Sequence, residues 1–197
     1  MSDYRVVNAV DETLRALLWS RIQFDSELAS IFLSETQLTF EPPYMLIEND
    51  KPIGDDLSIF LYRVLENGDM KNRPLEQLNT STQRYPPLSL NLFYLVTPLT
   101  KSTDNDHRVL SKTMQILYDN AVVNGSELQG VLKDSAEELR ITMAPLNLED
   151  LNKLWTSFMR PLRLSVSYEV KVAYIDSERE RTGELVRRKR LEFRQSG

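Results

Sequence analysis

The stretch YPPLSLNLFYLVTPL, residues 85–99, decides how the rest of this sequence is interpreted. Its residues alternate as in an extended strand, and one face would carry Leu88, Leu90, Leu92, Tyr94 and Val96. The opposite face would carry Phe93 and Leu95 among polar residues. Because both faces hold large apolar side chains, both must be covered. The cover comes either from helices of the same chain or from neighbouring copies, and the two answers imply different kinds of protein.

A second strand with the same property precedes it. The segment DLSIFLYRVLENG, residues 56–68, alternates apolar residues on both faces and ends in a turn at Asn67 and Gly68. The polar residues 69–84 are expected to form a long connecting loop. Two long apolar strands joined by one loop most simply pair antiparallel, which is the pairing we predict.

Three helices are predicted around these strands. Residues 4–21 and 105–120 have apolar side chains at helical spacing, and Asp104 or Asn105 is the expected N-cap of the second. Asn147 is expected to cap the third helix, with Asp150 at the capping-box position. The buried stripe of that helix is predicted to consist of Leu148, Leu151, Trp155 and Phe158.

Shorter strands are predicted at 36–43, where two prolines stop the strand, and at 138–145. Residues 163–174 alternate strictly between apolar and polar side chains. This pattern indicates a strand with one face toward solvent or against a polar partner. We expect the strand to lie where the helix cover ends and to leave an open edge. The order of elements predicts an α+β fold with a mostly antiparallel sheet flanked by helices.

The composition excludes several classes of function. The 197 residues include no cysteine and one histidine, so disulfides, thiolate catalysis and a zinc site are not expected. No phosphate-binding or hydrolase motif occurs, and the acidic residues around His107 are interpreted as helix capping. Without a long apolar run or a leader pattern, we expect a protein made in the cytoplasm that does not insert into a membrane. We expect neither enzymatic activity nor a cofactor, metal or small-molecule substrate.

Charge is unevenly distributed along the chain. Residues 178–197 hold seven basic and four acidic side chains, a net of +3, so the net charge of −5 leaves −8 for the rest. The basic run RRKR at 187–190 is a weak indication of nucleic-acid binding, because glutamates flank it and Phe193 is its only aromatic neighbour. A tail that contacts another subunit or an acidic partner is the favoured interpretation.

Five segments in order resemble one known family: residues 56–74, 85–99, 106–120, 147–158 and 162–176. They read DLSIFLYRVLENGDMKNRP, YPPLSLNLFYLVTPL, DHRVLSKTMQILYDN, NLEDLNKLWTSF and LRLSVSYEVKVAYID. Together they resemble the cap, or tail-terminator, proteins of extracellular contractile injection systems, which are phage-tail-like particles. The resemblance covers about residues 8–176, so we expect a cap domain at 1–176 and a charged extension at 177–197.

The resemblance implies a structural protein that forms a ring, expected to be a hexamer, at the end of the particle farthest from the baseplate. Its partners would be its own copies and the tube and sheath proteins, whose polymerisation it would end. The particle would assemble in the cytoplasm and could be released from the cell. The residues expected at the assembly interface are those of the tail: Arg187, Arg188, Lys189, Arg190, Leu191 and Phe193. The alternative is a nucleic-acid-associated connector that uses the same basic tail.

Overall fold

The two long apolar strands form the centre of the fold. In the computed structural model, which describes residues 3–71, 73–79 and 82–182, β4 (Asp56–Glu66) pairs with β7 (Leu88–Leu99). The pairing is antiparallel, as predicted, and places Ile59 opposite Val96. A bulge between Leu61 and Arg63 adds one residue to β4 and increases the local twist.

The main sheet has six strands in the order β1-β4-β7-β10-β9-β8. The added strands are β1 (Leu38–Thr39), β8 (Val122–Asn124), β9 (Glu138–Met143) and β10 (Val166–Ile175). Only the pairing of β1 with β4 is parallel, so the predicted α+β class with a mostly antiparallel sheet is confirmed. A separate hairpin joins β2 (Ile47–Glu48) to β3 (Lys51–Pro52).

Strand β10 is not at an edge, so the expectation that residues 163–174 leave an open edge is wrong. β10 lies between β7 and β9 and pairs with both. Its apolar residues Tyr168 and Val170 are buried in the main core, while Ser167 and Glu169 lie on the other face. The alternation of apolar and polar residues in β10 therefore indicates that the two faces of the sheet differ, and it does not indicate where the strand lies in the sheet order.

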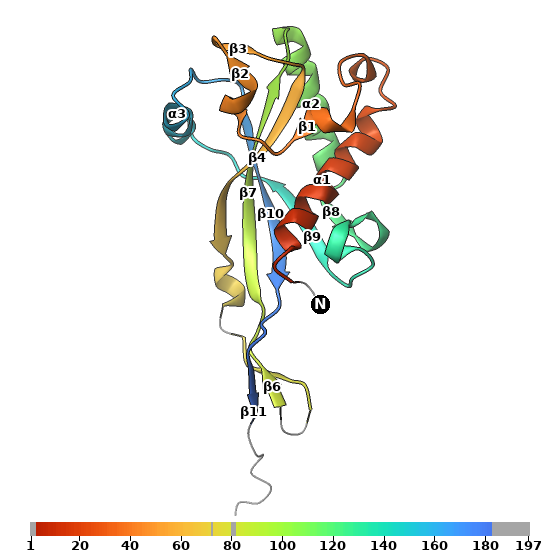
Figure 1. Cartoon of the computed structure of the whole chain (residues 1–197), viewed down its shortest axis with the longest axis vertical. Coiled ribbons are helices and arrows are strands. Elements are labelled where there is room, and N and C mark those ends of the chain that lie inside the picture. The colour runs from red at the N-terminus through yellow and green to blue at the C-terminus, as the bar shows by residue number, and fades with distance from the viewer. Residues whose placement is uncertain (1–2, 72, 80–81, 183–197) are drawn as a thin grey trace, which may run out of the picture.

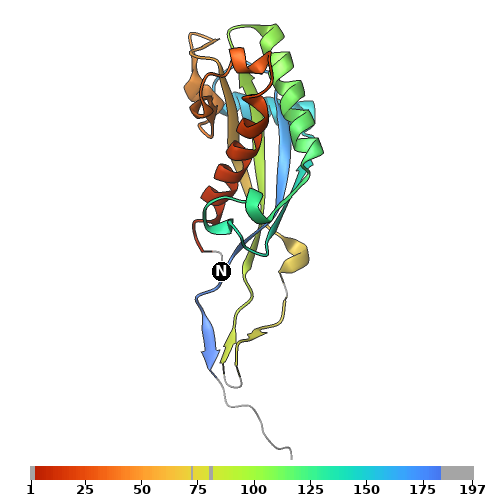
Figure 2. The same ribbon diagram turned by 90° about the vertical axis from the view of Figure 1, so that its right-hand side faces the viewer.

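Two helices cover one face of the sheet (Figure 2). They are α1 (Val6–Ile22) and α2 (Thr103–Asp119), and their apolar stripes share one core with the sheet. Asp11 of α1 accepts a hydrogen bond from the Tyr94 hydroxyl of β7 at 2.7 Å, and burial raises the pKa of Asp11 to about 6. Helix α2 begins at Thr103, which makes Ser102 its N-cap in place of the predicted Asp104 or Asn105.

The third helix, α3 (Leu148–Ser157), covers the upper part of the opposite face (Figure 1). Asn147 is its N-cap, as predicted, and accepts a hydrogen bond from the Asp150 backbone at 2.8 Å. Trp155 is fully buried in a small cluster with Ile47 and Leu99. Leu148 is 72% exposed and does not belong to the buried stripe, because it lies in the first turn at the margin of that stripe.

The polar connection between β4 and β7 is not only a loop. It contributes β5 (Glu76–Gln77) and β6 (Thr82–Arg84) to a three-stranded sheet with β11 (Glu180–Thr182). This sheet projects from the body at the lower end of β7 and β10 (Figure 1). The guanidinium of Arg179 lies 4.3 Å from the centre of the Tyr85 ring, and the Tyr85 amide donates to the Arg179 carbonyl. Strand β11 lies within the segment that was expected to be a separate extension.

Six short 3₁₀ helices complete the described part of the chain. They are η1 (Leu28–Ser30), η2 (Glu35–Gln37), η3 (Pro43–Leu46), η4 (Gly68–Met70), η5 (Gly125–Glu127) and η6 (Gly130–Leu132). The first three lie around the upper end of the body, and η6 packs against α1. The connections between the strands and helices are therefore ordered by local turns.

Candidate assembly surface

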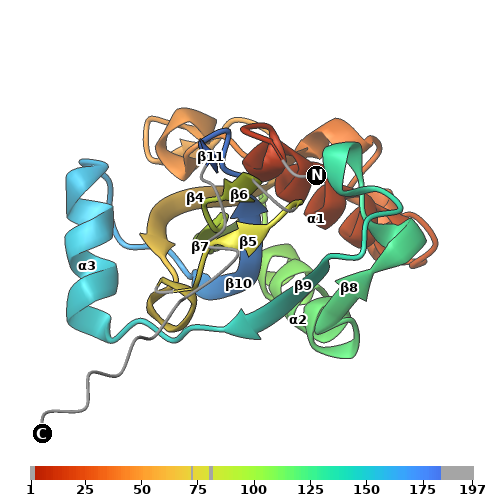
Figure 3. The same ribbon diagram turned by 90° about the horizontal axis from the view of Figure 1, so that it is seen from below.

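Among the described residues, no α-helix covers the lower half of the sheet face opposite α1 and α2, because α3 lies over the upper part of that face (Figures 1 and 3). We call this surface the open face. Strand pairing places on it Tyr62, Arg63, Leu65, Asn91, Phe93, Glu169 and Lys171. These side chains come from the three central strands, so a rigid scaffold positions all of them.

Polar side chains cross the open face as a hydrogen-bonded ladder. The Asn67 amide donates to Asn91 Oδ1 at 2.9 Å, and the Asn91 amide donates to Glu169 Oε1 at 2.8 Å. Lys171 Nζ lies 3.1 Å from Glu169 Oε2 and ends the row. Each member therefore holds its neighbour in one orientation, which fixes the shape of the surface before any partner arrives.

An aromatic pair lies beside the ladder. The rings of Tyr62 and Phe93 are 6.4 Å apart and nearly perpendicular, and the guanidinium of Arg63 lies 5.5 Å from the Phe93 ring centre. The Tyr62 hydroxyl is hydrogen bonded to Ser167 Oγ at 2.9 Å. The face thus combines half-buried aromatic rings with fixed charges, a composition typical of protein interfaces.

Strand β4 also has a free edge along this surface. Strand β1 pairs only with Leu57 and Ser58, and no other described strand adjoins β4 on that side. Val64 and Leu65 along this edge are 46% and 38% exposed. Unpaired backbone groups beside exposed apolar side chains are a template for pairing with another chain.

The described residues hold no cluster of three or more His, Asp or Glu side chains placed to bind a metal ion. His107 is exposed on α2, and the acidic residues near it have structural partners. Asp104 pairs with Arg108 at 2.8 Å, and Asp106 accepts two hydrogen bonds of 2.8 Å from Thr100. Both acidic residues lie in the first turn of α2, where the helix dipole favours a negative charge, but neither is the N-cap that was predicted.

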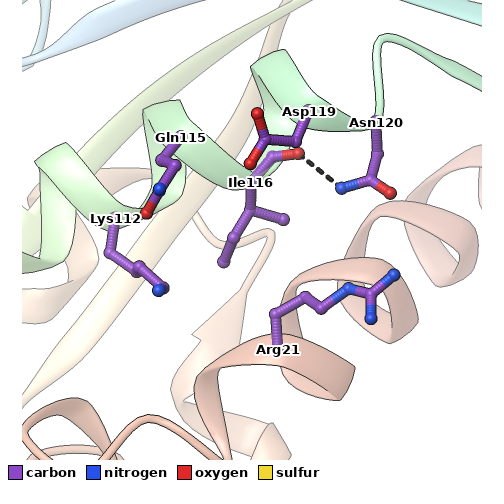
Figure 4. Close-up of a pocket in the computed structure, with 6 residues that line it drawn as sticks. All are labelled: Arg21, Lys112, Gln115, Ile116, Asp119 and Asn120. Atoms are coloured by element: carbon purple, nitrogen blue, oxygen red, sulfur yellow. Dashed lines mark hydrogen bonds between the residues drawn. The ribbon is translucent and has the colours of Figure 1, made fainter.

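A groove of about 360 Å³ runs between α1 and α2 (Figure 4). Arg21 of α1 lines one side, and α2 supplies the rest: Lys112, Gln115, Ile116, Asp119 and Asn120. The Asn120 amide donates to the Ile116 carbonyl at 2.8 Å, so it closes the end of α2. No helix among the described residues is long and apolar enough to cross a membrane.

The site residues predicted from the sequence, Arg187, Arg188, Lys189, Arg190, Leu191 and Phe193, lie outside the described residues. The open face lies on the strand face that the sequence left to be covered by helices or by neighbouring copies, but its residues and the β4 edge were not predicted as a site. A partial signal was present in β7, where Asn91 lies on the face that also carries Phe93 and Leu95. Polar residues on this face do not by themselves mark its uncovered part, because Thr97 on the same face is fully buried.

The chain matches known proteins over nearly its full length. The sequence model of the Pvc16 N-terminal domain matches residues 9–189. A search of curated proteins found no match. The fold is similar to the PVC sheath/tube terminator of an extracellular contractile injection system in its extended state, with a TM-score of 0.64 and 20% identity. That similarity covers 97% of this chain and 64% of the terminator.

The cap of the anti-feeding prophage, a tube-terminating cap, is also similar. Its TM-score is 0.58 at 18% identity, over 98% of this chain and 62% of the cap. This chain therefore spans less than two thirds of the length of either protein.

Proposed function

Because the chain belongs to the Pvc16 N-terminal domain family, we propose that it is the terminal cap of a contractile injection particle. The observation that carries the proposal is the fold shared with a sheath/tube terminator over 97% of this chain. In this role the protein sits at the end of the particle farthest from the baseplate and ends the polymerisation of tube and sheath. The role requires binding surfaces and no catalytic group.

The cap acts as a closed ring, which we propose to be a hexamer. An isolated copy would leave the open face and the free edge of β4 in contact with water, including the half-buried rings of Tyr62 and Phe93. A ring or a tube end can cover such surfaces without an additional domain. The matches give no support to the alternative of a nucleic-acid connector.

The first prediction concerns the length of the particles. Particles produced without this protein are expected to have tubes and sheaths of uncontrolled length, with sheaths detached at one end, because nothing stops polymerisation there. Supplying the chain should restore a narrow length distribution and a ring at one end, as measured by negative-stain electron microscopy. A normal length distribution in its absence would overturn the proposed function.

We also propose that the basic tail is an assembly element. It carries +3 against −8 for the rest of the chain, so charge favours its contact with the acidic body of a neighbouring copy or with an acidic partner.

The second prediction tests the tail by truncation after Thr182, which keeps β11 and its pairing with β6. The truncated protein should retain the melting temperature of the full chain but cap fewer particles. The deficit relative to the full chain should shrink as salt is raised, because salt screens the charge contact that only the full chain makes. A matched variant with Arg187, Arg188, Lys189 and Arg190 changed to glutamine should show the same deficit. If both variants cap particles as well as the full chain does, the tail is dispensable.

A further inference from the structure

A carboxyl group of α1 is packed against the sheet. Asp11 accepts a hydrogen bond of 2.7 Å from the hydroxyl of Tyr94 in β7. Tyr94 is 1% exposed and belongs to the main core, and Asp11 itself is partly buried. The contact therefore lies at the margin of the core. A charged carboxylate in such surroundings is costly unless an opposite charge compensates it.

The basic side chain that could compensate this charge has other partners. Arg15 follows Asp11 by one turn of α1, but its Nε donates to the Leu38 carbonyl of β1 at 3.1 Å. The Arg15 guanidinium also lies 5.0 Å from the centre of the Phe40 ring, and that ring packs edge-to-face on Tyr94 at 6.4 Å. Arg15 thus attracts the Asp11 carboxylate only from a distance and forms no ion pair with it.

The elements packed against α1 bring no further cation to Asp11. On α1 itself, Glu12 is acidic and opposes the ionisation of Asp11. η6 (sequence GVL) and β1 (sequence LT) hold no titratable residue. β10 contributes Tyr168, a phenol whose pKa is raised by burial, while its charged residues Glu169 and Lys171 lie on the open face. Two basic residues of α2 pair with acidic residues beyond the end of α1: Lys112 with Asp25 at 3.1 Å and Arg108 with Glu27 at 3.4 Å.

Burial therefore controls the charge of Asp11. It raises the pKa of Asp11 to about 6, and the Tyr94 hydrogen bond and the charge of Arg15 oppose this rise only in part. Burial also raises the pKa of Tyr94 well above its ordinary value, so this hydroxyl remains a donor. In the unfolded chain Asp11 has the ordinary aspartate pKa of 3.8. The folded state binds more protons between these two values, so stability should rise as the pH falls from about 7 to about 4.

We propose that Asp11 and Tyr94 form a pH-dependent contact that holds α1 more firmly on the sheet when Asp11 is protonated. A neutral carboxyl group keeps the hydrogen bond to Tyr94 and removes an uncompensated charge from the margin of the core. Acid usually loosens proteins, because carboxylates that are paired in the native state become protonated. Here the first effect of mild acid is to stabilise the packing of α1, against which η6 and α2 also lie. This inference is independent of the proposed cap function.

Denaturant unfolding of the full chain at pH 7.5 and 5.5 tests the proposal, since both values lie above the isoelectric point of about 5.1. Asp11 alone should increase the folding equilibrium constant about fourfold at the lower pH, given its pKa values in the two states. Asp11→Asn keeps an oxygen that accepts from Tyr94 but never carries a charge. It should lose this increase and be at least as stable as the wild type at pH 7.5.

Two acidic residues define the control. Burial raises the pKa of Asp56 as well, which adds an increase of the same sign, so the difference between the wild type and Asp11→Asn is the quantity to measure. Asp104→Asn, at an exposed position of α2, should keep the wild-type dependence on pH. If Asp11→Asn keeps the same dependence as the wild type, the increase comes from other groups and the inference is wrong.

NMR of the side-chain carboxyl groups measures the proton directly in the wild-type protein. The Asp11 carboxyl should titrate with a midpoint near pH 6. In Tyr94→Phe the midpoint should move to higher pH, because the hydroxyl that stabilises the charged form is gone. An Asp11 carboxyl that is still fully ionised at pH 5.5 would overturn the inference. Neither measurement depends on particle assembly, so either result leaves the cap function to its own test.

Discussion

Trp155→Ala is expected to destabilise the fold by about 3–5 kcal/mol, the usual cost of truncating a large buried aromatic side chain. Trp155 is 0% exposed and packs against Ile47 and Leu99 in the cluster beneath α3. Its ring is also 5.7 Å from that of Phe158, in an edge-to-face arrangement. Since this cluster is separate from the main core, its loss should release α3 and the hairpin before the sheet unfolds.

Denaturant unfolding monitored by circular dichroism would measure the loss of folding stability in Trp155→Ala. Two matched variants show which interactions of the side chain account for it. The indole nitrogen of Trp155 has no hydrogen-bond partner among the described residues, so Trp155→Phe loses packing alone and should cost less than half as much. Leu148→Ala, in the same helix but 72% exposed, should change the stability by about 0.5 kcal/mol or less. An unchanged unfolding midpoint for Trp155→Ala would show that the side chain is not part of a core.

The contrast between Trp155 and Leu148 shows how far helical periodicity can predict burial. Both residues fall on the apolar stripe predicted from the sequence, yet one is fully buried and the other is 72% exposed. Periodicity fixes the direction of a side chain around a helix axis, but it does not fix how far the opposing surface extends. The surface opposite α3 is the upper part of one sheet face, and it ends before it reaches Leu148.

The strands also divide into features that the sequence pattern predicts and features that it does not. The antiparallel pairing of β4 with β7 could be predicted because both strands carry large apolar side chains at alternate positions over their whole length. The central position of β10 could not be predicted from the sequence, since alternation does not specify which strands are neighbours. The projecting sheet was missed because its strands, with two or three residues each, are polar and are defined by backbone pairing alone.

The open face answers the question raised by residues 85–99. Helices α1 and α2 cover one side of β7, and α3 covers the upper part of the other, where Leu95 and Leu99 are fully buried. Below α3 the composition of the face changes, and Asn91 joins the ladder to Glu169. The helices of the chain thus cover most of both faces of β7, and the open face remains for contact with other proteins.

Gly130→Ala is expected to destabilise the protein by about 2–4 kcal/mol, since it combines backbone strain with overpacking. Gly130 has a φ of +57°, where an alanine is strained in any surroundings. A Cβ at this position would also lie 3.0 Å from the Ala9 Cβ and 2.8 Å from Glu12 Oε2 on α1. The Glu12 side chain can rotate away, but Ala9 is fixed to the helix, so η6 and α1 would have to separate.

That separation would disturb the main core. The backbone amide of Gln129, next to the glycine, donates to the Thr13 hydroxyl of α1 at 3.0 Å. Leu128 and Leu132, on either side of this turn, are fully buried. A shift of η6 by a few tenths of an ångström would lengthen this hydrogen bond and loosen the packing of both leucines. Overpacked sites of this kind show a lower unfolding midpoint, which denaturant titration would detect.

Two other glycines separate the cost of backbone strain from the cost of the close contact between η6 and α1. Gly125 has the same φ of +57°, but a Cβ added there would meet no atom within 4 Å, so Gly125→Ala should cost only the backbone strain, about 1 kcal/mol. Gly68 has neither a positive φ nor a close neighbour, so Gly68→Ala should be neutral or slightly stabilising, because alanine reduces the entropy of the unfolded chain. The excess cost of Gly130→Ala over Gly125→Ala measures the close approach of η6 to α1. Equal costs at the two positions would mean that η6 moves away freely, and the packing argument for Gly130 would then be wrong.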